Sequence, residues 1–390
     1  MDKKRIQDLY DFYRKQLLEQ CMPFWLENSI DSGFGGYLTC LDREGSVYNT
    51  DKSVWFQGRG VWIYSKLYNE LEPNPVWLNA AATGFDFLLK HCFDKDGRLF
   101  FQVTQDGKPL RRRRYFYSEA FAIAACTEFY KATGDREALS RAMQTYDIVM
   151  DIYKNPQRME PKVIPETRIT RALAVPMILL VTTQILREAE YRPVYDKIAE
   201  ELVHTILHVF LKPDERALFE TVGPNGERLN SPQGRCINPG HAIETAWFLI
   251  QEGLYLKNND IIHTALNIIK WSLDIGWDKE YGGLLSFVDI EGKPAEQLEW
   301  NMKMWWPHTE ALYALLLAYD ITRDPYFETW YDKVHELTFS YFPDKEYKEW
   351  YGYLHRDGSV ANTLKGSMWK GPFHIPRALL LCMKLLEKIR

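Results

Sequence analysis

Three of the nine histidines recur at nearly equal intervals along the 390-residue chain. His241, His308 and His374 are separated by 67 and 66 residues, and each lies close behind a Pro or Gly at the start of a long apolar segment. An imidazole, whose ordinary pKa is about 6.5, accepts a proton in one state and returns it in the other near neutral pH. If a ring of repeats brings these positions together, the histidines predict a pocket for proton transfer.

Other polar and aromatic residues stand near the same points of the repeat. Glu244 lies three residues after His241, and Arg377 three residues after His374, so each pair shares one helix face. Helix N-termini add N–H donors and partial positive charge, which stabilise an oxyanion. Flat aromatic rings beside hydrogen-bonding groups suit a sugar. The further candidates are Gln57, Arg59, Ser118, Glu119, His308 and Glu310, with the aromatic residues Trp55, Tyr117, Trp305, Trp306 and Trp369.

Two other chemistries fit these residues less well. No HExxH motif occurs, and the carboxylates share their helices with histidines at spacings that do not select a metal, so we expect no metal site. Glycoside hydrolysis would use two of Glu119, Glu244 and Glu310, but it would not need matched histidines. The residues alone therefore indicate a proton-transfer enzyme that acts on a small polar substrate, which we interpret as a sugar.

The elements that must position these residues repeat as well. Each unit has an aromatic-rich hairpin around a turn glycine, followed by more than ten residues that are apolar at helical spacing. An acidic residue or Asn precedes each turn glycine, which supplies the positive φ of a tight turn. The segment 164–186 fills the place of one further copy without a clear hairpin. The turn glycines are Gly45, Gly107, Gly226, Gly292 and Gly358.

A second kind of helix is expected between these units. The segments 75–93, 136–153, 259–276 and 325–342 each have one polar and one apolar face, as outer helices should. Units of this size stack on their neighbours, because none buries its apolar face alone. We therefore predict a single all-α domain over residues 1–390. It is an (α/α)6 barrel with short β-hairpins in the loops at the active-site end, and an open solenoid is the alternative.

Composition limits the partners and the compartment. The net charge is −5 and the longest basic run, Arg111–Arg114, has four residues, which argues against a nucleic-acid partner. No segment resembles a secretion signal or approaches the ~20 apolar residues of a membrane span. The six cysteines form no CxxC pair, so we expect reduced thiols in a cytoplasmic protein without a membrane partner.

Six strings along the chain resemble the N-acylglucosamine 2-epimerase family, and the resemblance covers essentially the whole chain. NPGHAIE followed by Trp247, together with WWPHTEAL, points to the acylglucosamine branch. The third inner helix carries Met177 and lacks the histidine expected of a cellobiose epimerase. The family's fold is a six-fold α/α barrel. The strings are VWFQGRGVW, RRRRYFYSEAF, LAVPMILL, NPGHAIE, NMKMWWPHTEAL and KGPFHIPR.

The resemblance implies that N-acetylglucosamine and N-acetylmannosamine are interconverted at carbon 2 of the ring-opened sugar. One base removes the proton, and a second group returns one from the opposite face. The matching positions are His241 and His374. Arg59 would stabilise the oxyanion on carbon 1. Glu244 and Glu310 would orient the histidines or the sugar hydroxyls.

The resemblance also implies no cofactor for the chemistry, ATP as an activator that is not consumed, and a homodimer. His308 would assist ring opening or bind the sugar. The alternatives are an aldose–ketose isomerase of the mannose isomerase type, a cellobiose 2-epimerase, and a non-catalytic barrel that binds a sugar or a protein. The other residues expected to bind substrate are Gln57, Tyr117, Ser118, Glu119, Trp305, Trp306 and Trp369.

Overall fold

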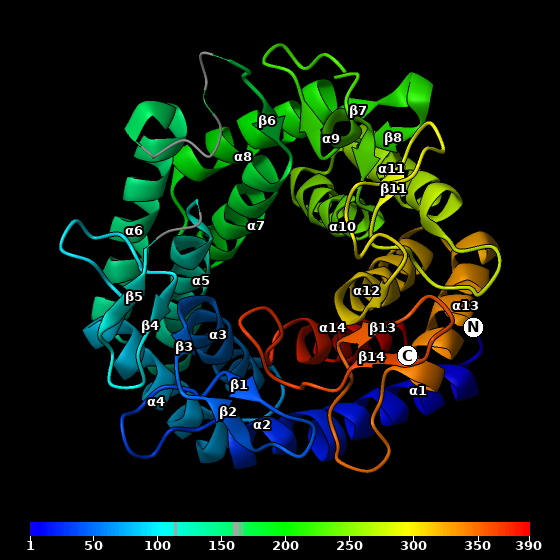
Figure 1. Cartoon of the computed structure of the whole chain (residues 1–390). Coiled ribbons are helices and arrows are strands. Elements are labelled where there is room, and N and C mark those ends of the chain that lie inside the picture. The colour runs from blue at the N-terminus through cyan, green and yellow to red at the C-terminus, as the bar shows by residue number, and fades with distance from the viewer. Residues whose placement is uncertain (113–114, 159–163, 165–166) are drawn as a thin grey trace.

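The inner helices of this computed structural model, which describes residues 1–112, 115–158, 164 and 167–390, form a ring. Each inner helix packs against the next, and the last, α14, packs back against the first, α3 (Figure 1). The closed barrel is therefore confirmed, and the open solenoid is wrong. The inner helices are α3 (Val54–Glu70), α5 (Tyr117–Thr133), α7 (Ala174–Ala189), α10 (Pro239–Leu256), α12 (Trp305–Thr322) and α14 (His374–Ile389).

Outer helices pack on this ring, each against the inner helix that precedes it in sequence. They are α4 (Pro75–His91), α6 (Arg136–Lys154), α8 (Pro193–Thr205), α11 (Asn259–Gly276) and α13 (Pro325–Tyr341). The helix α14 is the last in the chain, and α1 (Lys3–Lys15) packs against it from the opposite end of the sequence. The π-helical segments Gln16–Cys21 and Ile206–Phe210 follow α1 and α8. The short helices are α2 (Met22–Asn28), α9 (Pro232–Arg235) and the turns Pro156–Arg158 and Pro213–Glu215.

Short antiparallel strands lie next to the starts of the inner helices. Four strands that directly precede an inner helix pair with a strand of the following unit: β3–β4, β6–β9, β10–β11 and β12–β13. Hairpins within one unit are β1–β2, β4–β5, β7–β8 and β13–β14. The strands are β1 (Cys40–Leu41), β2 (Val47–Asn49), β3 (Lys52–Ser53), β4 (Gln102–Val103), β5 (Pro109–Arg111), β6 (Arg171–Ala172), β7 (Leu211–Lys212), β8 (Ala217–Leu218), β9 (Thr221–Val222), β10 (Cys236–Ile237), β11 (Val288–Asp289), β12 (Lys303–Met304), β13 (Tyr353–Leu354) and β14 (Val360–Asn362).

The predicted turn glycines all adopt the backbone that was expected of them. Their φ angles lie between 71° and 97°, a region that is unfavourable for residues with a Cβ atom. Paired strands flank Gly45, Gly107 and Gly358. Gly226 and Gly292 instead close tight turns through backbone bonds to Gly223 and Asp289, with no second strand after the turn among the described residues.

The core lies between and inside the two rings. The inner helix α12 buries residues on all of its sides, because it contacts two inner neighbours and the outer helices α13 and α11. The outer helix α11 instead buries one face, which carries Ile262, Leu266 and Ile269. In the described part of the chain, no helix combines the length and apolar character that crossing a bilayer requires.

Candidate active site

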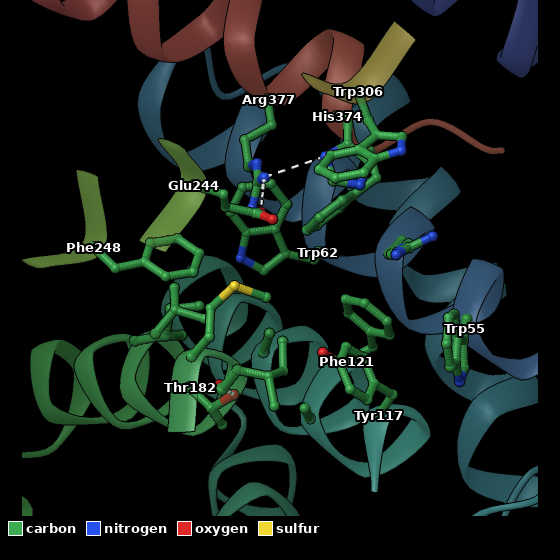
Figure 2. Close-up of a pocket in the computed structure, with 18 of the residues that line it drawn as sticks. Trp55, Trp62, Tyr117, Phe121, Thr182, Glu244, Phe248, Trp306, His374 and Arg377 are labelled. Carbon is green, nitrogen blue, oxygen red and sulfur yellow. Dashed lines mark hydrogen bonds and ion pairs between the residues drawn. The ribbon is translucent and has the colours of Figure 1, made fainter. Parts of the chain in front are cut away.

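Residues near the N-terminal ends of the inner helices line one cavity of about 390 Å³. Trp55 of α3, Tyr117 of α5, His241 of α10, Trp305 of α12 and His374 of α14 all belong to its wall. The inner helices therefore begin at the same end of the barrel, as the repeat predicted. Figure 2 shows residues of several helices pointing into this space.

His241 is held by its own helix and by a carboxylate from the preceding hairpin. The Asn238 side chain accepts a hydrogen bond from the backbone N–H of His241 at 3.1 Å, which caps the start of α10. The imidazole Nδ1 lies 3.0 and 3.1 Å from the two carboxylate oxygens of Glu220. Burial alone would lower the pKa of His241, but the charge and hydrogen bond of Glu220 outweigh it and raise the pKa. His241 therefore keeps its proton to a higher pH than a free imidazole does.

His374 has a different carboxylate environment. Its Nδ1 lies 2.8 Å from Oε1 of Glu310, and Arg377 donates from Nη2 to the same oxygen at 2.7 Å. Arg377 also donates to Glu244 at 2.6 Å, and the indole N–H of Trp247 donates to the second oxygen of Glu310 at 2.9 Å. The Glu310 carboxylate that faces His374 is thus shared with a buried cation.

This environment disfavours protonation of His374. Burial is the largest cause, and the positive charge of Arg377 is the next, so the pKa of His374 lies well below its ordinary value. In both histidines Nδ1 faces a carboxylate, which assigns the proton of the neutral ring to Nδ1. Within the described residues no side chain bonds either Nε2 atom, so these two nitrogens are available to a substrate.

The two imidazoles lie against one aromatic ring. The ring centroid of Trp306 is 5.0 Å from that of His241 and 5.9 Å from that of His374. Both histidines also line the same cavity. Residues that are far apart in sequence therefore converge on a space the size of a small ligand, as the matched spacing predicted.

Arg59 supplies positive charge to the same cavity. It is 9% exposed and donates from Nη1 to the backbone oxygen of Trp369 at 3.0 Å. Its guanidinium packs on the rings of Phe121 and Phe373, at 4.2 and 5.0 Å. No carboxylate forms an ion pair with it in the described part of the chain. Burial is the main cause that lowers the pKa of Arg59 to about 9, so it remains a cation at neutral pH.

Aromatic side chains make up much of the remaining wall near the helix starts. Trp55 stacks on Tyr117 at 5.3 Å, and the edge of Trp369 meets Trp55 at 5.6 Å. Trp305 and Trp306 complete this wall beside His374. Of the residues expected to bind substrate, these aromatic ones all line the cavity.

Four predicted substrate contacts are corrected by the structure, because their side chains do not line the cavity. His308 is fully buried, and its ring bonds the backbone oxygen of Met304 at 2.7 Å and the backbone N–H of Leu284 at 3.0 Å. Burial lowers the pKa of His308 to about 4. This histidine therefore fixes backbone around the start of α12 and is held neutral.

The other three corrections are Gln57, Ser118 and Glu119. Gln57 bonds the backbone N–H and oxygen of Tyr37, both at 2.8 Å. Glu119 accepts from the Arg98 side chain at 2.9 Å, and Ser118 is buried away from the cavity.

Helix geometry accounts for three of these corrections. Successive residues of an α-helix are rotated by about 100°, so a residue two positions away points to nearly the opposite side. His308 lies two positions after Trp306, and Glu119 two positions after Tyr117. Gln57 in the same way lies two positions after Trp55.

Sequence reasoning missed Glu220 and underestimated Arg377. Glu220 lies between β8 and β9, where no helical spacing links it to His241. Arg377 was noted only as a neighbour of His374, yet it joins Glu244 to Glu310. Its position on the face of His374 was the one available signal.

The cluster of Glu244, Glu310 and His374 has the composition of a metal site. Their ligand atoms all lie within 4.8 Å of one another. The Arg377 guanidinium, however, already bonds both carboxylates. A metal ion would therefore have to displace a buried cation, which makes this cluster a poor site for one.

Comparison with known proteins places the chain in a family. Residues 36–377 match the sequence model described as N-acylglucosamine 2-epimerase (GlcNAc 2-epimerase). The chain is 38% identical to the N-acylglucosamine 2-epimerase of Bos taurus, over 95% of this chain and 90% of that protein. It is 36% identical to the Homo sapiens N-acylglucosamine 2-epimerase, over 95% and 88% of the two chains.

Solved structures share the barrel. The cellobiose 2-epimerase from Bacillus thermoamylovorans B4167 superposes with a TM-score of 0.85 at 21% identity, over 98% of this chain and 100% of that chain. A D-mannose isomerase gives a TM-score of 0.82 at 19% identity, over 97% and 98% of the chains. At these identities the structures show the fold alone. Because the family match spans most of the sequence, the chain belongs to the N-acylglucosamine 2-epimerase family.

Proposed function

We propose that this protein is an isomerase that interconverts N-acetylglucosamine and N-acetylmannosamine by proton transfer at carbon 2. One observation carries the proposal: two histidines with oppositely shifted pKa values line the same cavity. Oppositely shifted titrating groups in one site are the usual arrangement of an acid and a base. The family membership supports the choice of substrate.

The reaction starts from the ring-opened aldehyde, in which the carbonyl makes the proton on carbon 2 acidic. Neutral His374 takes this proton on Nε2, and the electron pair moves onto the carbon 1 oxygen. Arg59, which has no carboxylate partner in the described residues, stabilises that oxyanion. Protonated His241 then delivers a proton from its Nε2 to the opposite face of carbon 2, which inverts the centre. The reverse reaction exchanges the two roles.

The carboxylates orient these groups. Glu220 and Glu310 hold the Nδ1 side of each imidazole, so that Nε2 faces the substrate. Arg377 fixes Glu310 and Glu244, and Glu244 borders the cavity within reach of a sugar hydroxyl. The arrangement favours epimerisation over aldose–ketose isomerisation, because moving a proton between carbons 2 and 1 on one face needs only one base.

The test is turnover of N-acetylmannosamine in deuterated water, followed by NMR. We expect N-acetylglucosamine with deuterium at carbon 2, and accumulation of a ketose would contradict the proposal. His241→Gln and His374→Gln should each reduce epimerisation at least 100-fold. Each variant should still exchange the carbon 2 proton of one epimer with solvent, because one base remains. His263→Gln, an exposed histidine of α11, is the control and should leave turnover unchanged. A fully active, folded His374→Gln would contradict the assignment of His374 as the base, and a folded parent protein without any turnover would support a non-catalytic barrel.

The same proposal covers the surroundings of the enzyme. No cofactor takes part in the chemistry, ATP acts only as an activator, and the protein works in the cytoplasm as a homodimer. The six cysteines are free and buried, which suits a reducing compartment. Assays with and without ATP, sedimentation of the purified protein and imaging of a tagged copy test these points.

A further inference from the structure

The cavity continues far below the two histidines. Its wall on α3 runs from Trp55 to Lys66, and its wall on α10 runs from His241 to Gln251. With a rise of 1.5 Å per residue, these spans are about 15 Å long. The cavity is therefore a shaft along the barrel axis, with the histidines near one end.

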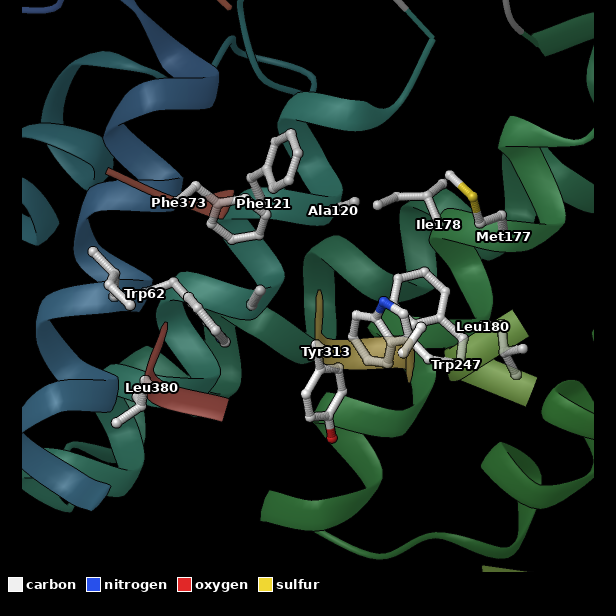
Figure 3. Close-up of a cluster of buried hydrophobic side chains, with 14 of the residues drawn as sticks. Trp62, Ala120, Phe121, Met177, Ile178, Leu180, Trp247, Tyr313, Phe373 and Leu380 are labelled. Carbon is white, nitrogen blue, oxygen red and sulfur yellow. The ribbon is translucent and has the colours of Figure 1, made fainter. Parts of the chain in front are cut away.

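The lower shaft is mostly apolar. The residues that line it beneath the histidines include Ala120, Ala124, Ile178, Val181, Ile185, Phe248 and Leu381. Thr182 also reaches this wall, but its hydroxyl already donates to the backbone oxygen of Ile178 at 2.6 Å. In Figure 2, Phe248, Thr182 and Phe121 face the polar group of Glu244, Arg377 and His374. Figure 3 shows how apolar side chains such as Trp62, Ile178 and Trp247 gather inside the ring.

Among the described residues, charged side chains line the shaft again at its bottom. Lys66 forms ion pairs there with Glu70 and Glu128, and Glu188 pairs with Lys131 at 3.3 Å. The sugar hydroxyls need hydrogen-bond partners, and these are concentrated around the histidines. The only substantial apolar part of the proposed substrate is its acyl group, which is attached to the reacting carbon through nitrogen. The acyl group therefore starts at the level of the histidines, where the shaft opens beneath it.

We infer that this shaft, formed by Ala124, Ile178, Val181, Ile185 and Phe248, binds the N-acyl group and accepts acyl chains longer than acetyl. The inference rests on the proposed epimerase activity and adds the class of substrate: glucosamines and mannosamines that carry unbranched acyl chains of up to about six carbons. Each additional methylene leaves water and enters the apolar shaft, which strengthens binding.

The first experiment compares N-acetyl-, N-propanoyl-, N-butanoyl- and N-hexanoylglucosamine with the unmodified protein. We expect kcat/KM to hold or rise along the series, by up to about fourfold per methylene. That ratio corresponds to ~0.8 kcal/mol per buried CH2. A tenfold fall from acetyl to butanoyl, with the acetyl substrate still turned over, would overturn the inference and leave the proposed function intact. If no member of the series reacts, the proposed function fails, and this inference fails with it.

The second experiment narrows the shaft from one wall. Val181→Phe should lower the kcat/KM ratio of the hexanoyl to the acetyl substrate at least tenfold, because the larger ring fills the space below the acetyl position. Val181→Ala should raise the same ratio, which keeps the test valid if the larger side chain impairs folding. Val194→Phe makes the same substitution at an exposed position of α8 and should leave the ratio unchanged. Equal losses for both substrates in Val181→Phe would show that the acyl chain does not occupy the shaft.

Discussion

The two cavity histidines differ because their carboxylate partners differ. Glu220 faces His241 without a cation bonded to it among the described residues, so its negative charge favours the imidazolium form. Glu310 faces His374 but also binds Arg377, whose charge disfavours a second cation nearby. The pKa values of the two histidines are thus shifted in opposite directions. In our mechanism this makes His374 the base and His241 the acid in the resting protein.

Replacing Glu220 by Gln should shift the alkaline limb of the pH profile of kcat/KM to lower pH. His241 acts as an acid only while it is protonated, so kcat/KM falls as pH rises through its pKa, which lies above 6.5 because of Glu220. Glu220→Gln removes the charge, lowers that pKa and shifts the limb to lower pH. We expect a loss of about tenfold at pH 8 and a smaller loss at pH 6, measured as kcat/KM between pH 5 and 9.

Glu220→Asp is the matched control, because it keeps the charge. It should retain the position of the limb even if its rate falls. A purely structural role for Glu220 would reduce activity by the same factor at every pH, and that result would contradict the assignment.

The sequence predicted those site residues whose position depends only on the face of the helix that carries them. His241 and Glu244 are three residues apart on one face, and both line the cavity. His308 occupies a matching place in the repeat by residue count, but it is turned away from the cavity by its phase within α12. Glu220 could not be predicted, because its contact with His241 depends on how a hairpin lies over the start of the next helix.

At the scale of elements, buried ion pairs connect the segments that precede inner helices with the segments that follow other helices. In three units a lysine from the segment before an inner helix pairs with an aspartate just after an outer helix or, in the first unit, after α2. All six side chains are 5% exposed or less. The pairs are Lys52–Asp31 at 2.8 Å, Lys303–Asp278 at 3.1 Å and Lys365–Asp344 at 3.0 Å.

Removing the lysine of one such pair should destabilise the folded protein strongly. Lys52 also donates to the backbone oxygens of Gly35 and Gln105, at 2.6 and 2.9 Å, so Lys52→Met leaves the buried Asp31 carboxylate without its cation and two carbonyls without this donor. We expect the free energy of unfolding to fall by about 3–5 kcal/mol at pH 7. Denaturant unfolding followed by tryptophan fluorescence measures this loss. Lys90→Met, in an exposed pair, should cost less than ~1 kcal/mol.

The same pair predicts a pH dependence. Burial alone would raise the pKa of Asp31, but hydrogen bonds from Lys52 and Gln105 outweigh it and lower the pKa below 3.8. Because the folded value is lowered, this stabilisation is present above pH 3.8 and is lost as pH falls through the folded pKa. The difference in the free energy of unfolding between the parent protein and Lys52→Met should therefore become smaller in acid. A difference that stays constant from pH 7 to pH 3 would contradict this account.

The sequence predicted the helices of both rings better than the strands that connect them. Apolar periodicity over more than ten residues locates α3 or α12 without ambiguity. A two-residue strand such as β10 carries no alternation of its own, and its partner β11 lies 52 residues away in the next unit. The strand pairs between units, which hold the helix starts in place, could therefore not be predicted.

At the scale of the whole molecule, helices from the two ends of the chain pack against each other. The other inner helices each pack against the outer helix that follows them in sequence, whereas α14 packs against α1 from the opposite end of the sequence. Tyr13 of α1 and Tyr331 of α13 meet through their hydroxyl groups at 2.5 Å in the buried interior. Nothing in the sequence indicated the place of α1 in the ring. A single domain over residues 1–390 stays a prediction, and it follows naturally from this arrangement.

The N-terminal helix should therefore be needed for the active site that α14 carries. Ile6 and Leu9 lie on the buried face of α1, and replacing both by Ala should lower the free energy of unfolding by at least ~4 kcal/mol, at about 2 kcal/mol or more for each site. Because His374 and Arg377 lie on α14, activity and tryptophan fluorescence should be lost together as denaturant rises, at a lower midpoint than in the parent protein. Lys4→Ala, at an exposed position of α1, should leave the midpoint unchanged. If the double variant keeps its activity through an early unfolding step, α1 is dispensable, and the ring is held closed by the inner helices alone.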